Sequence, residues 1–455
     1  MITTGQKRVP WSWAILITMP AFVLQLCESV SGNALTFTLR KFTEDPALIT
    51  LIGSSAIFFN FLISPYICWK SDRVWTRLGR RRPFLILGSL GTAAGLLFIP
   101  MAPSLAWVIV PILIYHMFFE FAFWGPFEPL INEVVPVHQR GRTGAIKAVF
   151  HNLGTISFGL ILIGQFDKVF LGGKLSGETM IYWIAAAFCV LIAMHFAFSV
   201  RETYAAPLPV TERFSPFSFA RDLFGEFQWR MVYLLVFIQI SLQAGLANLA
   251  PLLMTEQFHY TKATMGQLEA LGNMSRVFLF LPIAGILTDR VDRIKLLLFG
   301  VTVSTLQPIL YWGYIQFLAP GKIPPIPMII FFDWLNAGAD VMANISLAAL
   351  FFDFIPRKRM GTVYAGMTFV RGLMKLLVVN GVGIWVKYYS RWLIADGKND
   401  YSSGMLFLFS VGVFGVAMTL YVARQRKNGR LVEYGRMEAE EAPSFAIPNK
   451  EAVSV

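Results

Sequence analysis

The chain has 455 residues, of which 56% are apolar and only 15% are charged, and its mean hydropathy is +0.58. These values exclude an ordinary soluble domain, in which roughly a quarter of the residues are charged. The formal charge of +12 does not indicate a nucleic-acid partner, because the cations lie in short segments between apolar runs. We therefore expect an integral membrane protein surrounded by a lipid bilayer.

Apolar runs of about 20 residues recur along the whole chain, and each is long enough to cross a hydrocarbon core of roughly 30 Å as a helix. Their continuity favours helices over the alternating strands of a membrane barrel. The predicted spans are 13–37, 46–69, 83–102, 105–132, 143–166, 178–200, 231–255, 263–287, 294–317, 325–352, 361–387 and 402–423. The predicted fold class is an all-α integral membrane protein with about twelve transmembrane helices in two pseudo-symmetric bundles of about six.

A polar, proline-containing stretch, residues 201–230, divides the spans into two sets. We predict an N-terminal bundle over 1–200, a central loop over 201–230, a second bundle over 231–423 and a mobile tail over 424–455. Most Lys and Arg residues fall on the side of both termini, which the positive-inside rule assigns to the cytoplasm. The expected location is the plasma membrane, which is the inner membrane in a bacterium, with several crossings and both termini cytoplasmic.

Two pairs of loops repeat between the halves. SDRVWTRLGRRRPF (71–84) follows the second span and GILTDRVDRIKLL (285–297) ends the eighth, and both carry Asp-Arg and then further cations. EVVPVHQRGRTGAI (133–146) and FDFIPRKRMGTVYA (352–365) follow the fourth and tenth spans. Any cytoplasmic loop collects Arg and Gly, but two matched pairs in the same order predict homologous halves.

Ionisable side chains at membrane depth are costly, so they indicate a partner or a water-filled cavity. On the tenth span the acids and amides recur at helical spacing and form one narrow stripe, and the eighth span carries a second stripe. The candidates for substrate binding or proton coupling are Gln25, Glu28, His116, Glu120, Trp124, His151, Glu269, Asn273, Arg276, Asp333, Asn336, Asp340, Asn344, Arg371 and Lys375.

Each candidate also has a structural interpretation. Glu269 and Arg276 fit a charge network that holds helices together, and Arg371 with Lys375 fit static counter-ions. The histidines fit hydrogen-bonded interior groups, and Trp124 fits ordinary packing. The acids Asp333 and Asp340 repel each other on one face, so they need a cation, a proton or a polar ligand nearby.

Together these features resemble the major facilitator superfamily, in which the loop after the second helix carries Gly, then Asp-Arg, then Gly-Arg-Arg. The matching residues are Asp72, Arg73, Gly79, Arg80 and Arg81 in the first half and Gly285, Asp289, Arg290 and Arg293 in the second. Cys68 stands where the first leading Gly is usual. The resemblance implies that these residues form a conformational latch between the halves. The long spacing from Arg73 to Gly79 is similar to the sucrose and glycoside symporter branch.

The resemblance implies a secondary active transporter that works by alternating access. A sugar or glycoside is the expected substrate and a proton the expected coupling ion. Na⁺ is less favoured, because residues 46–69 contain no acid. The rivals are a proton-coupled exporter of drugs or metabolites and a non-transporting membrane assembly factor. We expect a monomer and no enzyme activity, cofactor, metal or catalytic residue, since no motif for them is present and the three cysteines have no ligand spacing.

Overall fold

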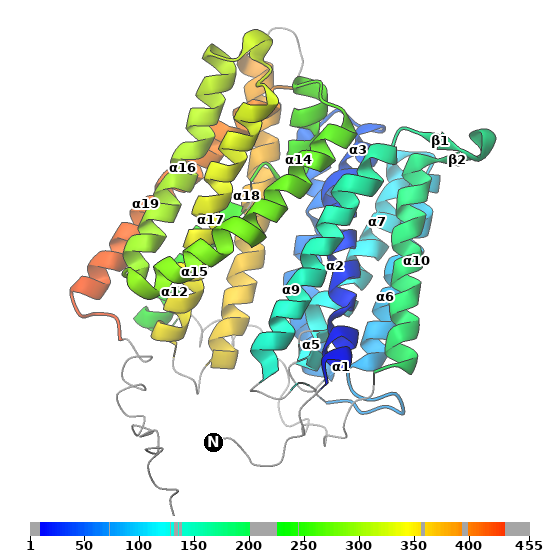
Figure 1. Ribbon diagram of the computed structural model, residues 1–455, viewed down its shortest axis with the longest axis horizontal. Coiled ribbons are helices and arrows are strands. Elements are labelled where there is room, and N and C mark those ends of the chain that lie inside the picture. Colours follow the sequence, from blue (N-terminus) through cyan, green and yellow to red (C-terminus); the bar gives the residue numbers. More distant parts are fainter. Residues whose placement is uncertain are drawn as a thin grey trace, which may run out of the picture.

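The computed structural model describes residues 10–71, 73–127, 129–131, 135, 139–200, 225–243, 245–355, 360–393 and 399–432. Within these ranges the chain is almost entirely helical, and its sheet is a two-stranded antiparallel hairpin, β1 (Val169–Phe170) with β2 (Leu175–Ser176). Figure 1 shows the helices standing side by side in two groups. The predicted all-α membrane fold is confirmed.

The first bundle spans the described residues from Trp11 to Phe198, and a short 3₁₀ turn, η7 (Leu171–Gly173), joins its two strands. Some of its crossings are built from several helical pieces in succession. The pieces are α1 (Trp11–Thr18), α2 (Pro20–Ser29), η1 (Val30–Ala34), α3 (Leu35–Arg40), α4 (Pro46–Gly53), α5 (Ser55–Ser71), α6 (Arg82–Phe98), η2 (Ile99–Met101), α7 (Leu105–Phe119), η3 (Glu120–Phe127), α9 (Arg140–Ser157), η5 (Phe158–Leu162), η6 (Ile163–Gln165) and α10 (Gly177–Phe198).

The second bundle follows the same plan with longer helices. Its pieces are α12 (Phe227–Gln243), η8 (Ala247–Leu249), α13 (Ala250–Leu252), η9 (Leu253–Gln257), α14 (Lys262–Ser275), η10 (Arg276–Phe280), α15 (Leu281–Arg290), α16 (Arg293–Phe317), η11 (Pro320–Lys322), α17 (Ile326–Phe354), α18 (Met360–Leu393), η13 (Tyr401–Ser403) and α19 (Gly404–Lys427). The predicted loop 201–230 lies mostly outside the described residues, and α12 begins within it. Helix α19 continues four residues beyond the predicted end of its span.

Ten helical segments among the described residues are long and apolar enough to cross a membrane, and two shorter apolar helices are Pro46–Asn60 and Phe227–Ile238. Large apolar side chains lie on the outer surface, including Trp107 (68% exposed) and Phe278 (78% exposed). Such exposure is unfavourable in water but matches a hydrocarbon environment. The described helices therefore account for the apolar runs of the sequence.

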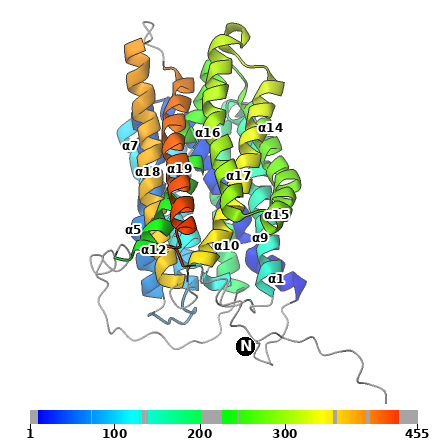
Figure 2. The ribbon, with the colours of Figure 1, turned by 90° about the vertical axis from the view of Figure 1, so that its left-hand side faces the viewer.

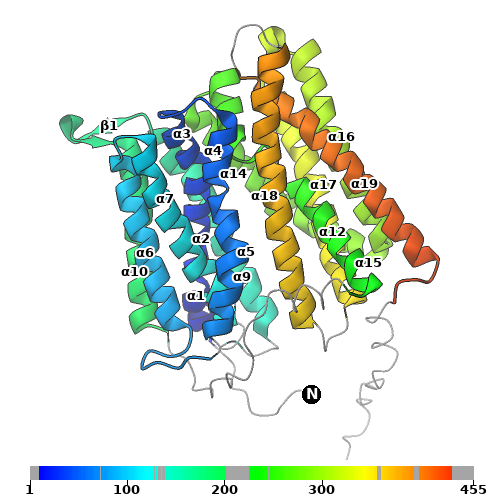
Figure 3. The same ribbon diagram turned by 180° about the vertical axis from the view of Figure 1, so that it is seen from behind.

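The ends of the helices define two faces of the molecule. The terminal face carries the start of α1 and the end of α19, and the far face, at the opposite end, carries the hairpin β1–β2 (Figure 1). In Figure 2, turned by 90°, α1 again lies at the terminal face. In Figure 3, α16 and α19 lean away from the first bundle as they approach the terminal face.

The buried apolar residues divide in a way that matches this tilt. One core contains the interior of the first bundle together with far-face residues of the second, such as Leu252, Val382 and Met405. A separate core fills the second bundle toward the terminal face and includes Trp229 and Phe354. The two bundles thus share a continuous apolar core near the far face.

Candidate functional site

Several membrane helices change to wider π-helical turns at the polar residues of the interior. Segment η1 contains Ser31 and Asn33, while η3 begins at Glu120 and η10 begins at Arg276. A π turn inserts one residue into an α-helix and turns side chains out of the regular stripe, and such turns are frequent at functional sites. The polar side chains are therefore set by local helix distortions as well as by helical spacing.

His116 joins three helices of the first bundle. Its Nε2 lies 2.9 Å from Ser31 Oγ and its Nδ1 lies 2.7 Å from Ser55 Oγ. The ring is fully buried, so both nitrogens find partners where water does not reach. One turn later, Glu120 is 3% exposed and accepts a hydrogen bond of 2.6 Å from Asn60 Nδ2.

The other candidates of the first bundle lie on the helices that the sequence predicted. Glu28 and Gln25 are half-buried on α2, and Gln25 Oε1 has no hydrogen-bond partner among the described residues. His151 is half-buried on α9, within electrostatic range of Lys147 one turn earlier. The side chain of Trp124 lies outside the described set.

Cys27 and Cys189 touch as free, buried thiols with their sulfurs 3.5 Å apart.

Arg276 is the centre of the second bundle's polar group. Its charge acts on Glu269 from its own crossing and on Asp333 and Asp340 from α17. The carboxylate of Asp333 lies against the Cα of Gly272, where any side chain would collide with it. One cation of the eighth span therefore acts electrostatically on both acids of the tenth-span stripe and on Glu269 of its own span.

The remaining candidates support or flank this group. Asn344 Nδ2 donates to Asp340 Oδ1 at 2.7 Å, and Asn273 Nδ2 donates to the Glu269 carbonyl at 3.0 Å. Asn336 is half-buried on α17 between the two acids. Arg371 is half-buried on α18, and Lys375, one turn further on, is exposed. Arg276 is thus a cation whose charge acts on both acids of α17.

Hydrogen bonds join the halves at membrane depth. Asn33 Nδ2 of η1 donates to Glu269 Oε2 at 3.1 Å. Asn380 Nδ2 of α18 donates to Ser54 Oγ at 3.0 Å, at the break between α4 and α5. Glu269 also interacts electrostatically with Arg276 and Asp333. The Asn33–Glu269 bond therefore connects the polar group of the second bundle to the first bundle.

Ion pairs join the halves at the far face. Arg40 Nε donates to Glu256 Oε1 at 2.7 Å, and Tyr401 OH donates to the other oxygen of Glu256 at 3.0 Å. Lys387 of α18 pairs with Asp45, which caps the N-terminus of α4. These contacts close the far face in this conformation.

The Asp45 pair makes far-face closure sensitive to acid. Burial raises the pKa of Asp45, but the Lys387 hydrogen bond and the Ala47 N–H together lower it below its ordinary 3.8. The stabilisation is therefore fully present above pH 3.8 and is lost as the pH falls through the lowered pKa. Asp45→Asn should lower the melting temperature of the detergent-solubilised protein at pH 7, by on the order of 1 °C.

The difference from wild type should shrink at the most acid pH at which the protein stays folded. Glu44→Gln is the matched control, because Glu44 is the preceding residue and its side chain is 86% exposed. Its ion pair with Arg40, at 3.3 Å, stays within the first half and contributes little in that much solvent. It should leave the melting temperature unchanged at either pH. A difference for Asp45→Asn that stays constant down to pH 3 would contradict this role for the carboxylate.

The predicted latch residues lie at the terminal face. Gly79 has a positive φ of 112° and closes a short turn with Thr76 through two backbone hydrogen bonds. Arg81 is 5% exposed and donates to Ser71 Oγ at 3.2 Å.

Arg73 and Arg80 are half-buried, while Asp72 lies outside the described residues. Arg82 donates to the carbonyls of Phe196 and Ala197, at the C-terminus of α10.

The second loop is also tied within its own bundle. Arg293 Nη1 pairs with Asp353 Oδ2 at 2.5 Å, and Arg426 Nη1 pairs with Asp292 Oδ2 at 2.9 Å. Gly285 lies on α15 with open space beside it and Arg290 is exposed, but the side chain of Asp289 is not described. The named contacts of both loops stay within one half, and a latch between the halves remains a prediction.

Several residues at the interface were missed from the sequence. Between the halves they are Asn33 at membrane depth and Arg40, Asp45, Glu256 and Lys387 at the far face. Ser31, Ser55 and Asn60, which contact His116 and Glu120 within the first bundle, were missed as well. The neutral residues carry no charge signal. The charged residues of the far face lie at the ends of predicted spans. They could have been found from the sequence, because cations on that side are few and each one is therefore conspicuous.

The sequence profile of the Major Facilitator Superfamily matches residues 17–379, which is most of the chain. The chain belongs to the Major Facilitator Superfamily. Sequence comparison with curated proteins finds no match. The superfamily resemblance stated from the two loops is confirmed, and its narrower sucrose and glycoside branch stays a prediction.

Solved structures share the superfamily fold at low sequence identity. A D-xylose-proton symporter aligns with a TM-score of 0.67 and 14% identity, covering 90% of this chain and 97% of its own. A POT family transporter in complex with a thioalcohol conjugated peptide gives 0.72 and 11%, covering 92% and 96%. The nucleoside transporter NupG gives 0.66 and 13%, covering 90% and 99%. This superfamily member is therefore a multi-pass membrane transporter and not an enzyme.

Proposed function

We propose that this transporter works by alternating access and carries a sugar or glycoside together with a proton. The observation that carries the proposal is the Asn33–Glu269 contact, because it links the acidic group around Arg276 to the opposite half. A rocking motion that opens the far face must break this contact. Protonation of the acidic group and movement of the halves are thereby coupled at the Asn33–Glu269 contact.

The orientation follows from charge. Most cations lie on the terminal face, which the positive-inside rule places in the cytoplasm. We place the protein in the plasma membrane with both termini inside. The far face is then external, and the Arg40 and Lys387 ion pairs close it; these contacts support an inward-facing conformation.

The chemistry of the interior supports a polyhydroxylated substrate. The neutral amides of Asn33 and Asn60 donate to the carboxylates of Glu269 and Glu120, and the Ser55 hydroxyl contacts the His116 ring. Such groups donate and accept hydrogen bonds in fixed directions, as the hydroxyls of a sugar ring require. Among the solved structures of this fold is the D-xylose-proton symporter named above.

The test is uptake of radioactive sugars by right-side-out vesicles under an imposed pH gradient. Symport predicts accumulation driven by an inside-alkaline gradient, and its collapse when a protonophore is added. A Na⁺ gradient at equal pH should drive no accumulation. Indifference to sugars with extrusion of dyes would show a drug or metabolite exporter. No flux of any solute, with tight binding of a protein partner, would show an assembly factor.

A further inference from the structure

Lys262 occupies an unusual position at the start of α14. It is the first residue of the helix, directly after the N-cap Thr261, whose side chain accepts from the Thr264 N–H. The backbone dipoles of a helix disfavour a cation at this end. Contacts made by the ammonium group elsewhere must therefore offset that cost.

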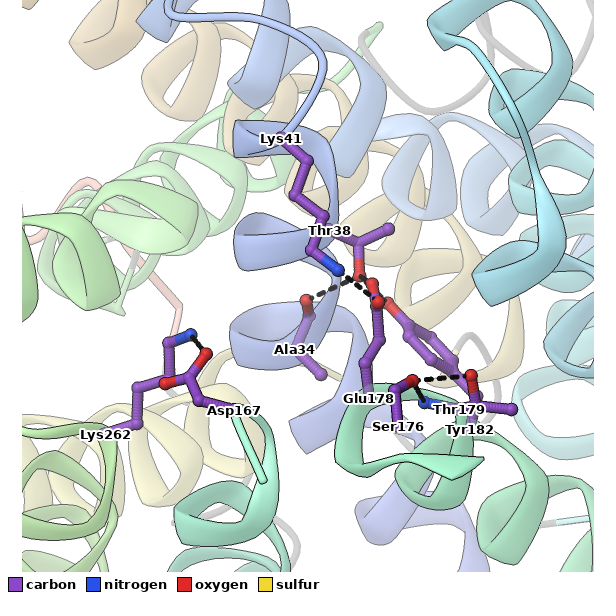
Figure 4. A network of polar contacts seen from close by, with 9 residues as sticks. All are labelled: Ala34, Thr38, Lys41, Asp167, Ser176, Glu178, Thr179, Tyr182 and Lys262. Carbon is purple, nitrogen blue, oxygen red and sulfur yellow. Dashed lines mark hydrogen bonds and ion pairs between the residues drawn. The ribbon is translucent and has the colours of Figure 1, made fainter. Parts of the chain in front are cut away.

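Those contacts come from the opposite half. The Lys262 ammonium lies 4.5 Å from the centre of the Phe37 ring and 4.2 Å from the centre of the Phe166 ring. It also pairs with Asp167 Oδ1 at 2.5 Å, as Figure 4 shows. Two aromatic faces and a carboxylate are the groups that recognise alkylammonium ions in proteins.

The ring contacts and the carboxylate contact of Lys262 differ in their exposure to solvent. Phe37 is 6% and Phe166 is 4% exposed, and the Lys262 side chain is 18% exposed, whereas the Asp167 side chain is 71% exposed. A carboxylate in that much solvent is screened and contributes little. The buried rings act on a largely desolvated ammonium group, where the attraction is stronger.

The neighbouring backbones hold Lys262 in register with these rings. A side chain at Gly266 would collide with the carbonyl of Gly159 in η5, and one at Gly164 would touch Ala263. Helix α14 therefore lies flush against η5 and η6 of the opposite half. If the halves separate at the far face, Lys262 has to leave the rings.

We propose that Phe37, Phe166 and Asp167 form an alkylammonium-binding site that Lys262 of the other half fills when the far face is closed. Lys262 is in effect a tethered ligand, and its departure is part of opening the far face. The proposal rests on the alternating movement described under Proposed function. It assigns the main attraction to the rings and not to the exposed carboxylate.

Lys41 provides a matched control. Its ammonium lies 5.4 Å from the centre of the same Phe166 ring, but it pairs with Glu178 of its own half. Glu178 is buried and also accepts from Thr38 Oγ1 at 2.7 Å (Figure 4). Lys41→Gln therefore removes a neighbouring cation without removing a contact between the halves.

The experiment measures the distance between spin labels on the far face by double electron–electron resonance. The labels are placed at Leu171 and Leu318, which are 75% and 72% exposed and belong to different halves, after the native cysteines are replaced by alanine. Purified full-length variants are compared in detergent with 0.5 M salt. The measured quantity is the ratio of open to closed populations.

Lys262→Gln and Phe166→Leu should each raise the open-to-closed ratio by about three- to tenfold, and Lys262→Arg should keep it near wild type. Asp167→Asn and Lys41→Gln should change it by less than about twofold at this salt. An increase for Asp167→Asn as large as that for Lys262→Gln would overturn the aromatic site in favour of a simple ion pair. An unchanged ratio for both Lys262→Gln and Phe166→Leu would overturn the site altogether.

Phe37→Leu provides a second variant if Phe166→Leu does not fold, with the same expected increase. The distance measurement needs no substrate. Failure to detect sugar uptake would therefore count against the proposed function and leave this result unaffected.

Discussion

Replacing Asp340 with asparagine is expected to abolish proton-driven accumulation of substrate while equilibrium exchange continues. The amide cannot release a proton but keeps the size of the side chain and can still contact Asn344, which now donates to Asp340 Oδ1 at 2.7 Å. Binding and movement of the halves should survive, whereas the link to the proton gradient should not. We expect accumulation to fall by about tenfold or more, the size of a typical coupling between two sites, and exchange to change by less than about threefold.

The measurement compares gradient-driven uptake with counterflow in the same proteoliposomes. Asp353→Asn is the matched control, because Asp353 lies on the same helix but pairs with Arg293 at the terminal face. Loss of the Asp353 charge should change gradient-driven uptake and counterflow by the same factor. Full accumulation by Asp340→Asn would remove Asp340 from proton coupling.

Replacing Arg276 with glutamine should cause the largest loss of stability among the interior variants. The charge of Arg276 acts on Glu269, Asp333 and Asp340, and its removal takes this opposite charge away from three buried carboxylates. Breaking a buried charge pair typically costs about 3 to 5 kcal/mol. Because Arg276 is half-buried and water reaches part of it, we expect about 2 to 3 kcal/mol.

A second change should restore part of this loss. Asp333→Asn removes one of the stranded charges, so Arg276→Gln with Asp333→Asn should melt at a higher temperature than Arg276→Gln alone. Arg290→Gln, at an exposed position on the same crossing, should leave the melting temperature unchanged. A double variant that shows the sum of the two single losses would mean that these residues do not interact.

The crossing helices were predictable from the sequence because apolar length alone specifies them. The end of α10 at Phe198 and the start of α16 at Arg293 lie within two residues of the predicted bounds. The break between α4 and α5 at Ser54 and the π turns were not predictable. These distortions depend on partners from distant segments, such as Asn380 beside Ser54, and leave no periodic signal.

The candidate site was predictable only as separate helix faces. The spacing of Asp333 and Asp340 gave one stripe, but the cation that acts on both comes from another crossing. The packing of η10 against α17 brings it there. Lys262 was missed because a lysine after an N-cap threonine resembles any exposed helix start. Its aromatic partners, Phe37 and Phe166, read as ordinary core residues.

The proposed mechanism requires the polar residues inside the bundles to face one water-filled space, which opens alternately to the two sides. Its most direct test is the reaction of Asn344→Cys in reconstituted protein with a membrane-impermeant maleimide, alongside Phe331→Cys, which is on the same helix and 55% exposed on its surface. We predict that Asn344→Cys reacts from the terminal side and is protected by saturating substrate, while Phe331→Cys reacts only with a membrane-soluble reagent. An Asn344→Cys that behaves like Phe331→Cys would contradict the account.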